Sequence, residues 1–213
     1  MKRVQVWDIW IRITHWLLVL FFTLSYFTGE NSDIVHSFAG YVMMGLLSFR
    51  VVWGFIGGTY ARFVNFMYGP LETHEYTLSL MKGSPKHYYG HNPLAALMVF
   101  ALLGSLVATS FTGLKAQESV SESASNQVSI EKMVIEQAKV EDHPTTHEKH
   151  YGIHKKDDHD TYWEALHEFF AHFSLLLVAV HILGVIISST VHRESIMGSM
   201  VDGKKEPPLG RDD

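Results

Sequence analysis

The chain contains no cysteine among its 213 residues. This absence excludes disulfides, thiolate-bound zinc, iron–sulfur clusters and the covalent attachment of c-type haem through a Cys-x-x-Cys-His motif. Charged residues are also scarce, at 18% of the chain, whereas 47% of the residues are apolar. Any cofactor must therefore be held by side chains other than cysteine.

The apolar residues are gathered into four long segments. These segments run approximately over residues 9–27, 34–56, 93–111 and 163–191. Each offers about 18 or more mostly apolar residues, which is the length that an α-helix needs to cross about 30 Å of hydrocarbon. The sequence therefore predicts a single all-α membrane domain over residues 1–213, with four transmembrane helices.

The distribution of Lys and Arg predicts how these helices are oriented. Short flanks on the cytoplasmic side of a membrane are enriched in basic residues. Basic residues lie before or at the start of the first span, between the second and third spans, and after the fourth: Lys2, Arg3, Arg12, Arg62, Lys82, Lys86, Arg193, Lys204 and Lys205. We therefore expect both termini in the cytoplasm. Segment 115–162, which holds ten acidic residues against six Lys, is expected on the opposite side.

Two histidines in the last span, His167 and His181, lie fourteen positions apart. In an α-helix this spacing separates them by about 21 Å along the axis and by roughly 40° around it. One helix face thus carries an imidazole near each side of the bilayer, where ionisable side chains are rare and usually functional. Counted from the span ends, His15 shares the inner level with His181, and His36 shares the outer level with His167.

Two neutral imidazoles that face each other from different helices are the axial ligands expected of a b-type haem held without covalent attachment. Mononuclear zinc or copper would gather three or four ligands at one level, which these positions do not provide. We therefore predict a transmembrane four-helix bundle that binds two b-type haems through the pairs His15/His181 and His36/His167. Interhelical hydrogen bonding by the histidines is the alternative.

Two further polar residues lie near these levels. His172 is in the same span as His167 but points about 140° away from it, so we expect a packing or interfacial role, with substitution as the outer ligand as the alternative. Arg50 follows His36 by fourteen positions and reaches the level of the inner pair. Its guanidinium is either a partner for a haem propionate or a snorkelling group at the membrane interface.

Several stretches distributed over the chain carry a family resemblance. They are Arg12–Trp16, Arg50–Gly57, Tyr60–Phe63, Gly90–Pro93, and His167 with His181. Together they resemble the bacterial cytochrome b561 family, which is related to the b-type cytochrome subunit of nickel–iron hydrogenase. The resemblance covers all four spans and implies a di-haem protein of the bacterial inner membrane. It assigns the same four histidines as axial ligands, in the same pairs.

The resemblance implies transmembrane electron transfer that links the quinone pool to a periplasmic or membrane redox partner, such as a c-type cytochrome. It leaves open whether the chain is itself a quinone oxidoreductase. A narrower alternative is a haem-bearing membrane anchor subunit of a hydrogenase or reductase complex. An alternative from a different class is a metal-ion transporter or sensor with a His-rich collecting loop. Membrane lipid is an expected partner and nucleic acid is not.

The segment between the third and fourth spans departs from the family pattern by a long polar insert, residues 115–162. We predict that it begins with a Ser-rich linker, Ser119–Ser129, and continues as a short helix over Ile130–Val140. Five histidines follow among acidic and basic residues: His143, His147, His150, His154 and His159. We interpret the insert as a solvated periplasmic loop, with docking of a basic electron carrier as the alternative. Neutral imidazoles would also allow it to bind zinc or copper.

The cytoplasmic loop between the second and third spans holds further candidates. We expect Tyr60, Arg62, Phe63 and His91 to border the inner haem. Both quinone contact and loop packing fit these residues.

Overall fold

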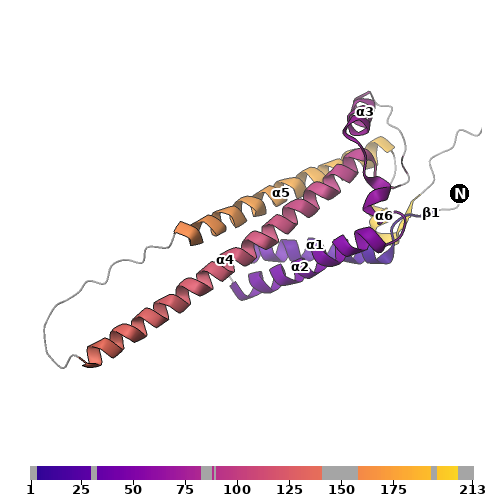
Figure 1. The fold of residues 1–213 in the computed structure, drawn as a ribbon. Helices are drawn as coiled ribbons and strands as arrows, with labels where there is room; N and C mark the ends of the chain where they lie inside the picture. Colours follow the sequence, from indigo (N-terminus) through magenta and orange to yellow (C-terminus); the bar gives the residue numbers. More distant parts are fainter. Residues whose placement is uncertain are drawn as a thin grey trace, which may run out of the picture.

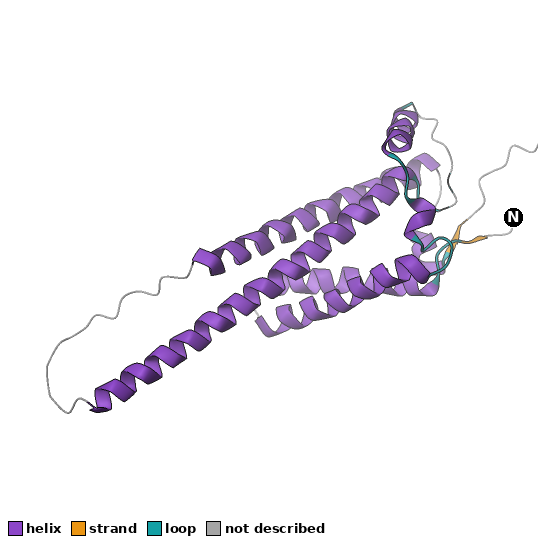
Figure 2. Cartoon of the chain, viewed as in Figure 1, coloured by secondary structure: helices purple, strands orange, loops and turns teal. Residues whose placement is uncertain are grey.

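Four long helices make up most of the computed structural model, which describes residues 4–29, 33–82, 88, 90–140, 158–192 and 196–205. They are α1 (Ile9–Thr28), α2 (Asp33–Ile56), α4 (Pro93–Val140) and α5 (Asp158–His192), and each holds a stretch long and apolar enough to cross a membrane (Figures 1 and 2). The shorter elements are β1 (Val4–Gln5), the 3₁₀ helix η1 (Phe63–Phe66), α3 (Pro70–Met81), α6 (Ile196–Asp202) and β2 (Lys204–Lys205). The predicted helical bundle with four apolar helices is confirmed.

Local capping explains where two of the long helices begin. The Asp8 carboxylate accepts a hydrogen bond from the backbone N–H of Ile11 at 2.9 Å and caps α1. The Asn92 side chain accepts from the N–H of Ala95 at 2.8 Å, and Pro93 follows as the first residue of α4. Proline suits this position because it has no N–H to leave unpaired and its φ angle is already helical.

Helix α4 continues far beyond the last apolar residue of its span. It runs for 48 residues, or about 72 Å, which is more than twice the thickness of the hydrocarbon layer. The prediction of a linker at Ser119–Ser129 is therefore wrong, because this stretch is helical. No Gly or Pro interrupts residues 114–140, and serine hydroxyls bond back to the helix, Ser119 to the carbonyl of Ala116 and Ser129 to that of Ser125.

The long helices form two antiparallel hairpins, α1 with α2 and α4 with α5 (Figure 1). The hairpins meet mainly where α2 packs against α4, through Met43, Leu47 and Leu106. Thr109 on α4 and the fully buried Ser174 on α5 share a hydrogen bond of 3.1 Å. Within the described ranges, α1 makes few close backbone contacts with α4 or α5.

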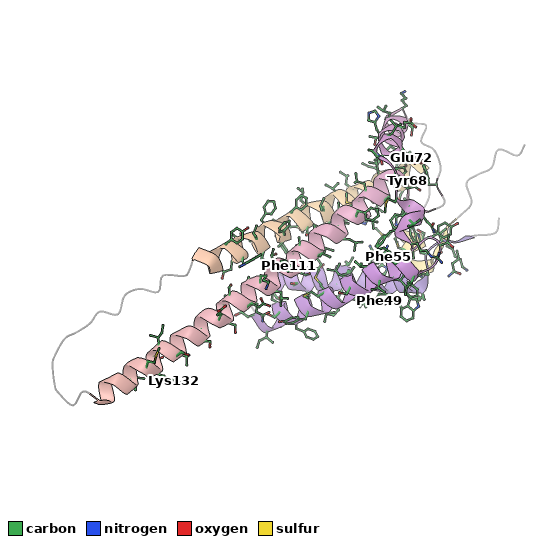
Figure 3. The ribbon with its side chains drawn as sticks, in the orientation of Figure 1. Phe49, Phe55, Tyr68, Glu72, Phe111 and Lys132 are labelled. Atoms are coloured by element: carbon green, nitrogen blue, oxygen red, sulfur yellow. The ribbon has the colours of Figure 1, made fainter. Side chains whose placement is uncertain are left out.

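Large apolar side chains cover the outside of the bundle. Phe49, Phe55 and Phe111, labelled in Figure 3, are 37%, 67% and 52% exposed, and Ile34 is 85% exposed. A soluble monomer rarely carries so large an apolar surface, whereas hydrocarbon chains solvate it without cost. The four helices are accordingly those of an integral membrane protein.

The two ends of the described chain are joined at one end of the bundle. Strand β1 pairs antiparallel with β2, with Val4 opposite Lys205, and the N–H groups of Val6 and Trp7 donate to the carbonyl of Gly203. Arg12 Nη1 donates to the carbonyl of Val201 as well. We call this pairing of residues 4–7 with residues 201–205 the terminal clasp. The end of the bundle that carries it is the inner end, and the opposite end, where α1 stops and α2 starts, is the outer end.

Gly54 provides a test of packing at the inner end. The ring of Phe63 lies directly against the backbone of α2 there, and a Cβ at Gly54 would overlap it. We expect Gly54→Ala to destabilise the protein by about 1–3 kcal/mol, although alanine is the better helix former. The matched control is Gly45→Ala on the same helix, where no atom lies within 4 Å of the added Cβ.

Thermal unfolding of both variants in detergent, followed by circular dichroism, makes the comparison. A lower Tm for Gly54→Ala and an unchanged or higher Tm for Gly45→Ala are expected. Equal Tm values for the two variants would contradict the packing of Phe63 against α2.

Candidate functional site

The outer end holds one pair of histidines on different hairpins. His36 lies in the first turn of α2, and His167 lies on α5. Their ring centres are 5.8 Å apart and their planes are almost perpendicular, at 88°. The structure therefore brings together the two residues that the sequence places at the outer level.

The inner end holds a second pair. His15 on α1 faces His181 on α5, with ring centres 6.5 Å apart and planes inclined at 58°. The edge of Trp16 contacts the His15 ring on another side, at 5.3 Å. His181 follows His167 by fourteen positions, so one helix carries one member of each pair, about 21 Å apart along its axis.

Both separations suit a metal that lies between the two rings. Imidazoles that bind one metal from opposite sides through bonds of about 2.0 Å have ring centres about 6 Å apart, because each centre lies about 1.1 Å behind its nitrogen. The observed 5.8 and 6.5 Å lie on either side of this value. The described residues contain no group of three or more His, Asp or Glu side chains placed to hold a metal ion. The described arrangement is thus one of paired imidazoles at two levels, not of three or four metal-binding side chains at one level.

Hydrogen bonds determine which ring nitrogen is available at the outer pair. Nδ1 of His36 lies 2.9 Å from the carbonyl oxygen of Ser25, and Nδ1 of His167 lies 2.9 Å from that of Thr109. A carbonyl only accepts, so each Nδ1 carries the hydrogen and donates it. Nε2 of both rings then keeps its lone pair, as a metal ligand requires.

Close packing on α4 holds the His167 ring in place. A Cβ at Gly113 would lie within 2.9 Å of two atoms of this ring, so only glycine lets the imidazole come this close to α4. The same approach brings Nδ1 of His167 to the carbonyl of Thr109, one turn earlier on α4. A single glycine thus permits both the position and the hydrogen bond of this histidine.

Arg50 supplies a buried cation near the inner end. It is 8% exposed, its guanidinium carbon lies 5.1 Å from the centre of the Phe63 ring, and its Nη1 is buried without a hydrogen-bond partner in the described structure. A snorkelling arginine would place this group in water instead. Asp8, the nearby carboxylate, is already engaged by the Ile11 N–H and by Trp53 Nε1 at 3.0 Å. The guanidinium is therefore available to an anionic group between the helices.

Residues 6–203, almost the whole chain, match the family model described as prokaryotic cytochrome b561. The chain belongs to the prokaryotic cytochrome b561 family. No curated protein and no solved structure gives a significant match to it. Membership makes the chain a membrane-embedded b-type cytochrome with a role in electron transfer.

The donor set of the chain fits the b-type haem typical of this family. Such a haem needs neutral nitrogen ligands from opposite sides and, in the absence of cysteine, has no covalent link to the chain. The outer pair of imidazoles, each with a free Nε2, meets the first requirement, and the buried, unpartnered Nη1 of Arg50 offers a positively charged hydrogen-bond donor to a propionate. Gly40, one turn after His36, has no atom within 4 Å of the position of a Cβ, which leaves room beside that ring.

His172 does not join either pair in the described structure. Its ring lies 6.1 Å from that of Tyr26 on α1, edge to face, and its Nδ1 bonds to the carbonyl of Glu168 on its own helix. This is a packing role, and it leaves His36 and His167 as the facing pair at the outer end. Of the insert histidines, His143, His147, His150 and His154 lie outside the described residues, as does the side chain of His159.

The cytochrome b561 chain also forms a small pocket at the inner end. Its volume is about 180 Å³, and it is lined by Tyr60, Asn65, Phe66, Tyr68, Tyr88, Gly90 and His91. The His91 ring packs between Trp7 and Phe66, with ring centres 4.7 and 4.4 Å away. Burial raises the pKa of Tyr68, so its hydroxyl stays protonated and donates to the carbonyl of His91 at 2.8 Å. Of the loop candidates, Tyr60 and His91 line this pocket, and Phe63 lies beneath Arg50.

Several contributors to the site have no recognisable sequence signal. Ser25 and Thr109 act through backbone carbonyls, which every residue possesses. Asp8 was detectable as a helix cap, but its bond to Trp53 joins residues 45 positions apart. Gly113 is one glycine among several in membrane helices, where glycine is common.

Gly113 provides a test of the outer site. We expect Gly113→Ala to push the His167 ring away from α4, and so to reduce the haem content of the purified protein by up to about half. Gly104→Ala is the matched control on the same helix, because nothing lies within 4 Å of its added Cβ. Haem is measured as the pyridine haemochrome per mole of folded protein. Full haem content in Gly113→Ala would contradict the packing role of Gly113.

Proposed function

We propose that the chain binds two b-type haems, one between His36 and His167 and one between His15 and His181, and carries electrons across the membrane. The observation that supports this proposal is the occurrence of two facing histidine pairs at two levels of one bundle. A b-type haem takes up and releases single electrons as its iron changes between the ferric and ferrous states. Transfer between the two levels would link the quinone pool to a periplasmic or membrane redox partner.

The protein's own contribution is to position and insulate these groups. Helix α5 supplies one ligand to each level, while α1 and α2 supply the opposing ligands. The carbonyls of Ser25 and Thr109 hold two of the imidazoles in the ligating tautomer. Arg50 would bind a propionate through its free Nη1 at the inner level. The surrounding apolar helices and lipid exclude water, which lowers the local dielectric.

The proposal places the inner end at the cytoplasmic face of a bacterial inner membrane. Arg12, Arg62, Lys82 and Lys204 lie in the clasp, in the loop after α2, or at the end of α3, and short cytoplasmic segments are enriched in such residues. Both described chain ends then lie in the cytoplasm, joined by the terminal clasp. The outer end, with His36 and His167, would face the periplasm.

The long extension of α4 favours a protein partner on the periplasmic side. The last part of α4 projects past the ends of the other helices, and Lys132 lies on this projecting part (Figures 1 and 3). Lys115 is neutralised by Glu118 at 2.7 Å, whereas Glu122 and Glu131 are exposed. We propose that this part of α4, which carries exposed Glu122 and Glu131 on opposite sides, helps to dock a basic carrier such as a c-type cytochrome.

The haem stoichiometry tests the central proposal. A dithionite-reduced minus oxidised spectrum of the purified protein should show b-type bands, with about two haems per chain by haemochrome assay. The metal-carrier alternative expects colourless protein. One haem per chain, or none, would contradict the proposal of two paired sites.

Histidine substitutions assign the two sites. Either His36→Ala or His167→Ala should remove one haem and leave the other, because each removes a ligand from the same pair. His172→Ala should retain both, since that ring packs on Tyr26. Circular dichroism confirms that each variant is folded. Retention of two haems in His36→Ala, or loss of one in His172→Ala, would contradict the assignment of His36 and His167 as the outer ligands.

The docking proposal has its own assay. Reduced protein in nanodiscs is mixed with a basic c-type cytochrome, and the oxidation of the b-type bands is followed by stopped flow. Replacement of Glu122 and Glu131 by Gln should slow the bimolecular rate a few-fold at low salt and weaken its dependence on ionic strength. Reduction of the same variant by a short-chain quinol is the control and should not change. An unaltered salt dependence of the rate would argue against docking at this part of α4.

A further inference from the structure

The two histidine pairs differ in the hydrogen bonds of their Nδ1 atoms. At the outer pair, His36 and His167 both donate to backbone carbonyls at 2.9 Å. At the inner pair, Nδ1 of His15 is buried without a partner, and His181 makes no side-chain hydrogen bond within the described structure. A hydrogen bond from Nδ1 to a carbonyl increases the electron density on Nε2 and makes the imidazole a stronger donor. Stronger donors stabilise ferric iron relative to ferrous iron.

The fixed charges near the two pairs also favour ferric iron at the outer pair and ferrous iron at the inner pair. The inner end has the buried guanidinium of Arg50. Asp8 attracts this cation but accepts its hydrogen bonds from Ile11 and Trp53, and Nη1 of Arg50 has no hydrogen-bond partner in the described structure. The outer end has acidic side chains close in sequence to the ligands, Asp33 before His36 and Glu168 after His167. Its nearby cation, Lys115, is paired with Glu118. A buried positive charge stabilises the reduced and more negative iron centre, because the low dielectric strengthens the attraction.

We infer that the outer pair holds its haem at a lower reduction potential than the inner pair, so that an electron shared by the two sites resides mainly at the inner level. This inference rests on the proposed binding of two haems. The exchange transfers one electron from ferrous iron at the outer pair to ferric iron at the inner pair. No bond is made or broken, and no further reactant is needed. The built-in direction runs from the end with His36 and His167 to the end with His15, His181 and Arg50.

A redox titration of the purified holoprotein in nanodiscs, followed at the b-type α-band, tests the inference. The expected result is two one-electron components that differ by at least tenfold in the equilibrium constant of reduction, which is about 59 mV. The His36→Ala protein should keep only the component of higher potential. Retention of only the lower component, or a single potential for both haems in the unchanged protein, would overturn the inference.

Arg50 variants test the same assignment without removing a ligand. Arg50→Leu should lower the higher component toward the lower one and leave the lower component in place, whereas Arg50→Lys, which keeps the charge, should shift it much less. If the lower component moves instead, the inner site has the lower potential and the inference is wrong. If Arg50→Leu lowers the thermal stability but leaves both reduction potentials unchanged, Arg50 has no electrostatic role and the inference is also overturned.

The titration separates this inference from the function on which it rests. Fewer than two haems per chain would contradict the proposed function itself. Two haems with equal or inverted potentials would leave that function intact and overturn only the direction of the internal step.

Discussion

Helix α5 presents two imidazoles toward the same side of the bundle at two depths. The arrangement of the other helices depends on this, because a histidine must face α5 at each depth. The fourteen-residue spacing places His167 and His181 near opposite ends of one span. Their partners must then come from helices that run in opposite directions, because His15 and His36 occur early in α1 and α2 respectively. An antiparallel hairpin of α1 and α2 opposite α5 meets this condition.

Helix α4 is the support on which α5 is held. Its backbone comes close enough to His167 for Gly113 to matter, and its Thr109 carbonyl accepts the ring hydrogen. Because α4 packs along α5 while α1 does not, the histidine pairs cross the less tightly packed side of the bundle.

The four spans and the two histidine pairs were accessible from the sequence, because hydrophobic length and helical spacing are local properties. The extent of α4 was not, since the apolar run ends near Phe111 while the helix continues to Val140. A serine-rich stretch is typical of a linker, but serine hydroxyls can bond to the carbonyls of the preceding turn and leave the helix intact. The sequence allows two roles for Arg50, and only its burial in the folded chain distinguishes them.

The sequence by itself determined the number of membrane helices, the depths of the paired histidines and the exclusion of cysteine-based cofactor chemistry. Only the tertiary structure decided how His36 and His167 are oriented, because their orientation depends on the backbone carbonyls of Ser25 and Thr109, which lie on other helices and have no distinguishing side-chain signal. The terminal clasp is likewise a tertiary feature, formed by residues about 200 positions apart. Short polar strands of two residues leave no periodic pattern, so their pairing emerges only when the bundle brings both chain ends to one side.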